Sequence, residues 1–557
     1  MYIGIDVGGT FTDGVLFEDG KVIRWIKELT EIDRLQETIL TVLDGLLADV
    51  DASEIKRLVV STTTVTNLFA TGRLEKAALV VIPGPGLNPN DLNLADDLYI
   101  VKGAIDFRGR EIEKINPTEV EQIITDIKDK GIKKAAIVGK FAQRNPVHEQ
   151  AAADIFSKKY PECEILMGHQ VSGRLNFPRR AVTAVYTLAT QDAWIHFTRE
   201  LEKALAQRNF SIPVEFMKAD AGTMSMDTSR KEPCQTVFSG PAASTMGAFA
   251  LTLDDKTSVV VDIGGTTSDL ALILGGKPLY ASKGARIEDR YTQIKALAVR
   301  SIALGGDSVV RIKDGQLTIG PDREGLAACF GGPSPTPTDA FNVAGEGQLG
   351  DIELSRQALA SLTKDGDAVQ KLAEDIVKEF VDLLGACVSD MLRQWEEEPL
   401  YKVWEIVNKR RARIDRVIGI GAAAPAFIPI LAERMKCEGY LHEYSPVANA
   451  LGAAVARPTI EVNYHADTQT GLWSIDGASG RLKEGARMQM DDARRLAQEQ
   501  LASLARERQM EDYLNETELL WEEQFNTIRG WSTSGKIFDV GIGIAPGVIL
   551  GFQGVKA

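Results

Sequence analysis

The residues best suited to chemistry stand in two segments that share one pattern. In each, an apolar strand leads to an Asp, a Gly-Gly-Thr turn follows, and a returning strand begins near a second Asp. The first segment contributes Asp6, Gly8, Gly9, Thr10, Thr12 and Asp13, and the second contributes Asp262, Gly264, Gly265, Thr266, Thr267 and Asp269.

This pattern is suited to binding phosphate. Glycine has no Cβ, so its backbone N–H can approach an anion closely, and the threonine hydroxyls add further donors. Carboxylates beside an anion make sense mainly if a hydrated Mg²⁺ lies between them. We therefore expect Asp6, Asp13, Asp262 and Asp269 to act in catalysis, with Asp6 and Asp262 at the Mg²⁺.

Two copies so far apart predict two related domains that face one nucleotide across a cleft. The alternative is a pair of ordinary glycine-containing β-turns, since short motifs produce false matches. The agreement in Asp, Gly-Gly, Thr and the second Asp favours phosphate binding.

Four other stretches contain candidate residues. Gly305, Gly306 and Asp307 form a turn after an apolar run, and Gly419, Gly421 and Ala422 follow the apolar strand 416–418. A strand, a Gly-x-Gly turn and a helix start are common to many nucleotide-binding folds. Lys218 ends the strand 214–218 and Asp220 follows it. We expect Asp220 to act in catalysis on the substrate side; the alternative is an exposed ion pair of these two residues at a strand end. The hydroxyl-rich stretch 61–67 is equally compatible with a helix N-cap and with ligand contact.

Composition narrows the class of protein. The chain has 557 residues, 44% of them hydrophobic and 25% charged, as in globular proteins of several domains. A net charge of −15 argues against nucleic acid or an anionic membrane surface as the main partner. The five cysteines include no C-x-x-C pair and the five histidines no H-x-x-x-H, which fits a reducing cytosol without a zinc site. With no signal-peptide pattern and no bilayer-length apolar run, we expect a cytoplasmic protein.

Hydrophobic periodicity and loop signals divide the chain into three parts. We expect a first lobe over 1–250, with a subdomain inserted over about 77–175, a second lobe over 251–457, and a C-terminal extension over 458–557. Strands alternate with helices, which predicts an α/β fold.

The order of two phosphate hairpins and a later Gly-x-Gly turn resembles the sugar kinase, heat-shock ATPase and actin superfamily. Within it, the opening stretch 3–13 and the second hairpin 262–269 resemble the hydantoinase/oxoprolinase family, A-type subunit. So do four shorter stretches: Asn145-Pro146-Val147-His148-Glu149, Phe238-Ser239-Gly240-Pro241-Ala242-Ala243, Gly305-Gly306-Asp307-Ser308 and Pro337-Thr338-Asp339-Ala340.

The resemblance implies a two-lobed actin-like ATPase fold built from duplicated ribonuclease H-like domains. It implies ATP and Mg²⁺ as cofactors, phosphates on the two hairpins, and adenosine on the Gly419–Ala422 turn. It also implies an ATP-dependent hydrolase that phosphorylates the carbonyl oxygen of a cyclic amide or similar substrate, together with a B-type partner subunit.

The chain departs from the family at 61–64, at 219–222 and in the reduced loop 323–332, and it is shorter than a typical A-type subunit. These departures leave the ATP motifs intact but keep a second hypothesis open, an ATPase switch that reactivates or remodels a cofactor-dependent partner protein. A small-molecule kinase is weaker because nothing in the sequence marks a sugar pocket.

Overall fold

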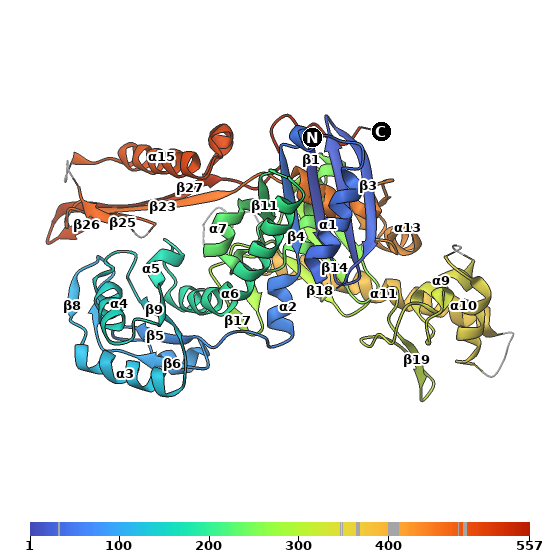
Figure 1. The fold of residues 1–557 in the computed structure, drawn as a ribbon, viewed down its shortest axis with the longest axis horizontal. Helices are drawn as coiled ribbons and strands as arrows, with labels where there is room; N and C mark the ends of the chain where they lie inside the picture. Colours follow the sequence, from blue (N-terminus) through green and yellow to red (C-terminus); the bar gives the residue numbers. More distant parts are fainter. Residues whose placement is uncertain are drawn as a thin grey trace.

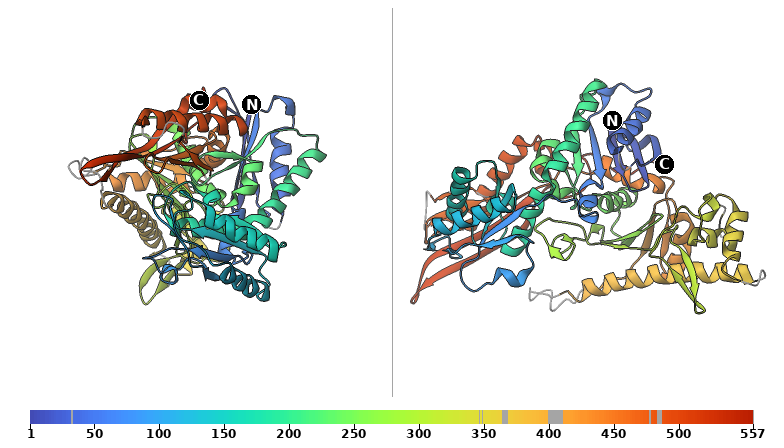
Figure 2. Two further views of the ribbon diagram at one scale, coloured as in Figure 1. Left: turned by 90° about the vertical axis from the view of Figure 1, so that its left-hand side faces the viewer. Right: turned by 60° about the horizontal axis from the view of Figure 1, so that its bottom comes forward.

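The computed structural model describes residues 1–31, 34–345, 347, 349–363, 368–398, 411–476, 478–482 and 487–556. Figure 1 shows two central lobes, with the inserted subdomain and the C-terminal domain side by side at one end and a helical part of the second lobe at the other. Figure 2 shows the same arrangement from two further sides.

The first lobe is built on a six-stranded sheet of order β12-β11-β4-β1-β2-β3. Its strands are β1 Tyr2–Val7, β2 Phe11–Glu18, β3 Lys21–Leu29, β4 Arg57–Thr62, β11 Val214–Met217 and β12 Thr223–Ser225. Four helices belong to this lobe: α1 Leu35–Leu46, α2 Thr64–Ala70, α6 Phe177–Gln207 and α7 Met226–Lys231. The apolar side chains of β1 and β4 lie in one core with those of α1 and α6.

The second lobe has a sheet of order β15-β14-β13-β21-β22, with β18 pairing with β14. Its strands are β13 Ser258–Ile263, β14 Ser268–Leu274, β15 Lys277–Pro278, β18 Val299–Ile302, β21 Arg416–Ile420 and β22 Glu438–Tyr440. Its helices are α9 Pro337–Ala344, α10 Ile352–Ala360, α11 Val369–Glu396 and α13 Ala424–Met435. A small hairpin, β19 Val310–Lys313 and β20 Gln316–Ile319, extends from it.

The two sheets repeat one local topology. β1 pairs antiparallel with β2 and parallel with β4, and β13 pairs antiparallel with β14 and parallel with β21. In both cases the central strand ends at the predicted catalytic Asp. The repeated hairpins seen in the sequence are therefore equivalent positions in two similar sheets.

Helices α8 Ser239–Thr252 and α14 Ala448–Val455 lie between the lobes. Their backbones approach so closely that only glycine fits at two contacts. A Cβ built on Gly247 would lie 2.0 Å from the Ala448 carbonyl oxygen, and one on Gly452 would lie 2.1 Å from that of Ala243. Helix α14 also packs on β1, where a Cβ on Gly4 would lie 1.9 Å from the Ala450 carbonyl oxygen. The lobes thus share these helices, and the boundary near residue 250 stays a prediction.

The segment 280–297, between β15 and β18, crosses from the second lobe to the first. It contains the short strands β16 Arg286–Ile287 and β17 Arg290–Tyr291. Ile287 and Ile294 belong to the first lobe's core, and the Leu297 N–H donates to the Ala219 carbonyl oxygen at 2.9 Å. This crossing segment fixes part of one lobe against the end of β11 in the other.

The inserted subdomain has a parallel sheet of order β10-β9-β5-β6 with two helices. Its elements are β5 Ala78–Ile82, β6 Leu98–Ile100, α3 Pro117–Asp129, β9 Lys134–Gly139, α4 Val147–Lys159 and β10 Glu164–Met167. His148 and His169 are buried here and bonded to Glu111 and Glu149, which makes them structural residues.

The C-terminal domain is an antiparallel sheet of order β25-β24-β23-β27-β26 that packs against α15 Met490–Glu507. Its strands are β23 Ile460–Asp467, β24 Leu472–Ile475, β25 Ala478–Arg481, β26 Thr517–Arg529 and β27 Ser532–Ile544. Ion pairs join it to the inserted subdomain and its neighbouring segment: Arg108–Asp467, Arg144–Asp539 and Arg174–Glu461. The chain then returns to the first lobe, where the Phe552 ring lies 5.5 Å from that of Phe17.

Candidate active site

The two hairpin turns have the same closure. In the first, the Gly8 N–H donates to the Phe11 carbonyl oxygen at 3.0 Å, and in the second the Gly264 N–H donates to that of Thr267 at 3.0 Å. Gly9, Gly264, Thr266 and Thr267 are exposed, so the turns are accessible to a ligand. This is the environment that phosphate binding by backbone N–H groups requires.

A single side chain joins the two hairpins. Asn449, in the first turn of α14, donates through Nδ2 to Oδ2 of Asp6 at 3.2 Å and to Oδ2 of Asp262 at 3.3 Å. Ser244 on α8 donates to the same oxygen of Asp262 at 2.6 Å. The structure therefore brings together carboxylates separated by 256 positions in the sequence.

The carboxylates of this site are held in a poorly hydrated environment. Burial raises the pKa of Asp6 to about 7, and the charges of Asp13 and Asp262 push it the same way, against hydrogen bonds from Ser61 and Asn449. Burial likewise raises the pKa of Asp262, and it raises that of Asp269 to about 6. An Oδ1 atom of Asp6 and one of Asp269 have no hydrogen-bond partner among the described residues. Groups of this kind favour a cation that brings compensating charge.

Asp13 differs from the other three because it has a cation of its own. The Lys27 ammonium lies 2.5 Å from Oδ1 of Asp13 and also donates to the Pro446 carbonyl oxygen at 3.2 Å. Thr12 points to the opposite side of β2, where it is fully buried and its Oγ1 lies 2.9 Å from that of Thr30. We therefore leave Thr12 out of the groups that we place at the phosphates.

The turn Gly305–Asp307 lies directly against the second hairpin. The N–H groups of Gly306 and Asp307 donate to the carbonyl oxygens of Gly264 and Gly265 at 2.9 and 2.8 Å. A Cβ on Gly305 would lie 2.4 Å from the Gly265 carbonyl oxygen, so this contact requires glycine. Gly305 and Gly306 thus support the hairpin, whereas Asp307 reaches toward its rim.

Arg323 links this rim to the hairpin. Its guanidinium lies 2.9 Å from Oδ2 of Asp307 and 3.4 Å from Oγ1 of Thr266. The loop that carries Arg323 is held by Asp339, a fully buried carboxylate that accepts hydrogen bonds from the N–H groups of Ala328 and Cys329. Motif residue Asp339 therefore has a structural role, and it places a cation beside the second hairpin.

The turn after β21 lies beside the same carboxylate. Gly421 has φ +86°, a conformation that favours glycine, and a Cβ there would lie 2.7 Å from the Ile263 carbonyl oxygen and 2.8 Å from Oδ1 of Asp262. Gly419 faces the apolar side chains Ile428 and Leu441, which is a packing contact, and Ala422 is exposed. Gly421 thus lies directly against the second hairpin.

Asp220 and Lys218 form a buried group of their own at the end of β11. Their side chains lie 3.2 Å apart, and the Thr459 hydroxyl bonds to both. Burial works to raise the pKa of Asp220, but Lys218, Lys295 and the Gly222 N–H together hold it below its ordinary value. Asp220 is therefore an ionised carboxylate outside the Asp6–Asp262 pair.

Mg²⁺ fits the residues at the hairpins when it arrives with a nucleotide. No group of three or more His, Cys, Asp or Glu side chains in the described part of the chain is arranged to hold a metal ion alone. Mg²⁺ usually keeps several waters and takes one or two carboxylates plus phosphate oxygens. Asp6 and Asp262, with the unpartnered Oδ1 of Asp6, match that requirement.

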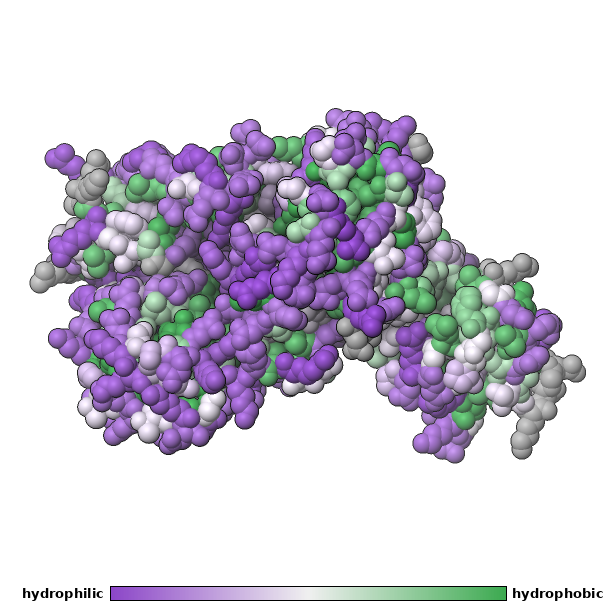
Figure 3. All heavy atoms as spheres, viewed as in Figure 1, coloured by the Kyte–Doolittle hydropathy of each residue, from purple (hydrophilic) through white to green (hydrophobic). Residues whose placement is uncertain are grey.

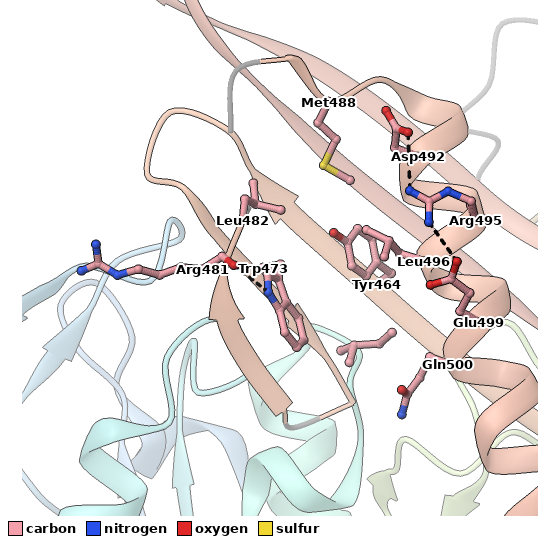
Figure 4. Close-up of a pocket in the computed structure, with 11 residues that line it drawn as sticks. Tyr464, Trp473, Arg481, Leu482, Met488, Asp492, Arg495, Leu496, Glu499 and Gln500 are labelled. Atoms are coloured by element: carbon pink, nitrogen blue, oxygen red, sulfur yellow. Dashed lines mark hydrogen bonds and ion pairs between the residues drawn. The ribbon is translucent and has the colours of Figure 1, made fainter. Parts of the chain in front are cut away.

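One cavity lies away from the hairpins, inside the C-terminal domain. It has a volume of about 550 Å³ and lies between α15 and the sheet. Figure 4 shows Trp473, Tyr464 and Leu496 around it, with Arg495 already bonded to Asp492 and Glu499. Its walls combine apolar side chains with charged ones, and no hairpin residue lines it.

Most of the surface seen in Figure 3 is hydrophilic. Among the described residues, no helix combines the length and the apolar character needed to cross a bilayer.

Comparison with known proteins identifies the family. The hydantoinase/oxoprolinase N-terminal region matches residues 2–160, and the hydantoinase/oxoprolinase family matches residues 180–462, half of the chain. The caprolactamase subunit alpha of Pseudomonas jessenii is 23% identical over 78% of this chain and 67% of its own length. The 5-oxoprolinase of Saccharomyces cerevisiae is 22% identical over 82% of this chain, which spans only 41% of that protein.

Solved structures confirm the predicted fold class. The ATP-dependent caprolactamase from Pseudomonas jessenii superposes with a TM-score of 0.72 at 16% identity, covering 97% of this chain and 87% of that one. Nucleotide-free acetone carboxylase gives a TM-score of 0.70 at 16% identity, with 98% and 87% covered. The two-lobed, actin-like α/β fold is therefore established, and the chain belongs to the hydantoinase/oxoprolinase family.

Proposed function

We propose that this chain is an ATP-dependent hydrolase that phosphorylates the carbonyl oxygen of a cyclic amide or similar substrate and works with a B-type partner subunit. The observation that carries the proposal is the contact of Asn449 with Asp6 and Asp262, which joins the two hairpins at one point. Membership in a family that includes ATP-dependent amide hydrolases supports the reaction class.

The hairpins are suited to positioning ATP. Backbone N–H groups of Gly9 and Gly265 and the hydroxyls of Thr10, Thr266 and Thr267 bind the phosphates, whereas the N–H groups of Gly8 and Gly264 close the two turns; Arg323 offers a cation nearby. Phosphoryl transfer asks a protein mainly for such positioning and charge neutralisation. Mg²⁺, when bound at Asp6 and Asp262, neutralises phosphate charge. We place adenosine at the turn 419–422.

The reaction then balances in three steps. The amide oxygen attacks the γ-phosphorus, the bond from that phosphorus to the β–γ bridging oxygen breaks, and ADP leaves. Water adds to the activated carbon and the ring C–N bond opens to give an acyl phosphate. A second water releases phosphate and the carboxylate. In the first step, Asp262 would hold the waters of a Mg²⁺ bound beside the transferring phosphoryl group.

A partner subunit completes the proposal because the related caprolactamase chain is itself a subunit. This chain spans 67% of that subunit and 41% of the yeast 5-oxoprolinase. In our scheme, the later hydrolytic steps take place on the partner subunit.

The test is an ATPase assay with 5-oxoproline, caprolactam and hydantoin, with and without a co-expressed B-type subunit. We expect one ring to stimulate ADP release, with one ring-opened product per ADP in the presence of the partner, and no stimulation in Asp262→Asn. ATP hydrolysis that no ring stimulates, but that a cofactor-dependent partner protein does, would replace this proposal with the ATPase switch.

A further inference from the structure

One arginine at the second hairpin stands in a loop where the chain departs from its family. Arg323 begins the reduced loop 323–332, and its side chain is 25% exposed. It lies against the glycine turn, because a Cβ built on Gly265 would lie 3.5 Å from Nη2 of Arg323. The Gly265 N–H is one of the groups that we place at the phosphates. This cation is therefore next to the proposed phosphate site.

The orientation of the guanidinium is fixed at two of its three nitrogens. Nε of Arg323 donates to the Gly325 carbonyl oxygen at 3.0 Å, and Nη2 donates to Oδ2 of Asp307 at 2.9 Å. Nη1 has a single acceptor among the described residues, Oγ1 of Thr266 at 3.4 Å. Because the guanidinium is planar, the two held nitrogens direct Nη1 toward the turn. Nη1 thus faces the turn with only a long hydrogen bond, and its N–H donors can bind an anion there.

The loop that carries this arginine is held in place on both sides. Before it, the Val309 N–H donates to the Asp322 carbonyl oxygen at 2.9 Å, and after it the buried carboxylate of Asp339 accepts two backbone N–H groups of the loop. Asp307 is itself fixed to the hairpin, because its N–H donates to the Gly265 carbonyl oxygen at 2.8 Å. The cation is therefore in position before a ligand arrives. A charge that is preorganised in this way needs little rearrangement during a reaction.

We propose that Arg323 is a catalytic residue for phosphoryl transfer and that Asp307 is the residue that positions it. In the first step of the reaction, the bond from the γ-phosphorus to the β–γ bridging oxygen breaks, and negative charge develops on that oxygen as ADP leaves. Nη1 of Arg323 donates to a phosphate oxygen beside the breaking bond and stabilises this charge. The inference rests on the proposed function and adds a residue to its first step.

The variants separate the cation from the stability of its loop. Arg323→Ala removes the charge, and Arg323→Lys keeps the charge but lacks the planar fork. Arg311→Ala is the matched control, because Arg311 also pairs with carboxylates, those of Asp322 and Glu324 on either side of Arg323. Among the described residues, Arg311 has no hydrogen bond or ion pair with the hairpin turn. It tests whether loosening the loop is enough to lower activity.

Two measurements are made on each variant. ATP turnover is followed with 5-oxoproline, caprolactam or hydantoin, whichever stimulates wild type most. Calorimetric titration compares Mg·ADP alone with Mg·ADP plus aluminium fluoride, which mimics the transferring phosphoryl group. We expect Arg323→Ala to lower kcat by about 100-fold and to change the KM for ATP by less than about threefold, since the hairpins hold the ground-state phosphates. The fluoride complex should lose about 100-fold in affinity, and Mg·ADP less than about threefold.

Arg323→Lys should lower kcat by at least about tenfold, because an ammonium cannot be held at two points and also reach the turn. Arg311→Ala should stay within about threefold of wild type in both measurements. Asp307→Asn tests the positioning role. It should lower kcat in the wild-type background, and it should have little further effect in Arg323→Ala, because Asp307 acts through the arginine.

Three results would overturn the inference: wild-type kcat in Arg323→Ala, equal losses for Mg·ADP and the fluoride complex, or an equal loss of kcat in Arg311→Ala. An undiminished effect of Asp307→Asn in the Arg323→Ala background would overturn the positioning role. Mg·ATP binding to wild type is titrated on the same preparation. If Mg·ATP binds and Arg323→Ala keeps its turnover, this inference alone falls; if Mg·ATP does not bind to wild type, the proposed function falls with it.

Discussion

The two glycine-turn hairpins have the same turn closure and the same strand register, but the surroundings of their second carboxylates differ. Asp6 faces Asp13 across β1 and β2, and Asp262 faces Asp269 across β13 and β14. Asp13 is paired with Lys27 at 2.5 Å, whereas one carboxylate oxygen of Asp269 has no partner among the described residues. The first lobe thus compensates a charge that the second lobe leaves open.

This difference bears on how far a bound cation compensates the carboxylate charges of each hairpin. Burial raises the pKa of both carboxylates in each hairpin, Asp6 and Asp13 in the first and Asp262 and Asp269 in the second, but the lysine paired with a second carboxylate is at Asp13. A cation that accompanies a nucleotide therefore relieves unfavourable charge at Asp6 in the first hairpin and at both carboxylates in the second. Asn449 couples the two, because it bonds to one carboxylate of each.

The largest effect that the comparison predicts is for Asp262→Asn. We expect a loss of ATP turnover of about 100-fold or more, as for removal of one preorganised charge-handling group. Asp262 is at a strand end, so the thermal midpoint should stay close to that of wild type. Asp13→Asn should cost much less, since Asp13 is already paired with Lys27. Turnover near wild type in Asp262→Asn would contradict the assignment.

Gly421→Ala tests the surroundings of the second hairpin. The added Cβ would lie against the Ile263 carbonyl oxygen and Asp262, in the turn where we place adenosine, so we expect ATP to lose affinity by about tenfold, or about 1.4 kcal/mol, and pyrophosphate to lose less. Gly331→Ala is the matched control, because Gly331 also has φ +86° but a Cβ there meets nothing within 4 Å. Calorimetric titration measures both ligands, and equal losses for the two would contradict the placement of adenosine at this turn.

Asn449→Ala and Ser244→Ala compare a link between lobes with a contact inside one. Asn449 bonds to both Asp6 and Asp262, whereas Ser244 bonds to Asp262 only. A hydrogen bond to a charged group contributes about 1.5–3 kcal/mol, so we expect about a tenfold rise in the Kd for Mg·ATP in Asn449→Ala and a smaller rise in Ser244→Ala. Equal effects in the two variants would show that coupling through Asn449 is unimportant.

The hairpins were predictable from sequence because their geometry is local. An Asp at a strand end and a glycine turn are fixed by a dozen neighbouring residues, and the two copies supported each other. The alternation of side chains along β2 also explains why Thr12 is buried while Asp13 faces the site.

The rest of the site depends on contacts that no local pattern contains. Asn449 stands in an alanine- and glycine-rich helix and meets Asp6 only because α14 packs on β1. Lys295 lines one cavity with Lys218 and Asp220 because the segment that carries it crosses between the lobes. Such partners are set by tertiary packing, and a lone Asn or Lys gives no periodic signal.

The smallest expected signal is a shift of the thermal midpoint with pH, which comes from the titration of Asp6. Burial raises its pKa from the ordinary 3.8 to about 7 in the folded protein. Between these values the folded state binds a proton that the unfolded state has lost, so the free energy of unfolding falls as the pH rises, by at most about 1.4 kcal/mol per pH unit. This contribution is complete below pH 4 and is lost as the pH passes 7.

Other groups titrate too, so the informative quantity is the difference between wild type and Asp6→Asn, which carries no titrating group at this position. We expect the thermal midpoint of wild type minus that of Asp6→Asn to fall from pH 5 to pH 8, by a few degrees or less because the chain is long. Mg·ATP favours the ionised carboxylate, so its affinity for wild type should rise over the same interval. A midpoint difference that is flat or rises with pH would mean that Asp6 is ionised in the folded protein, and the first hairpin would then need its cation as much as the second.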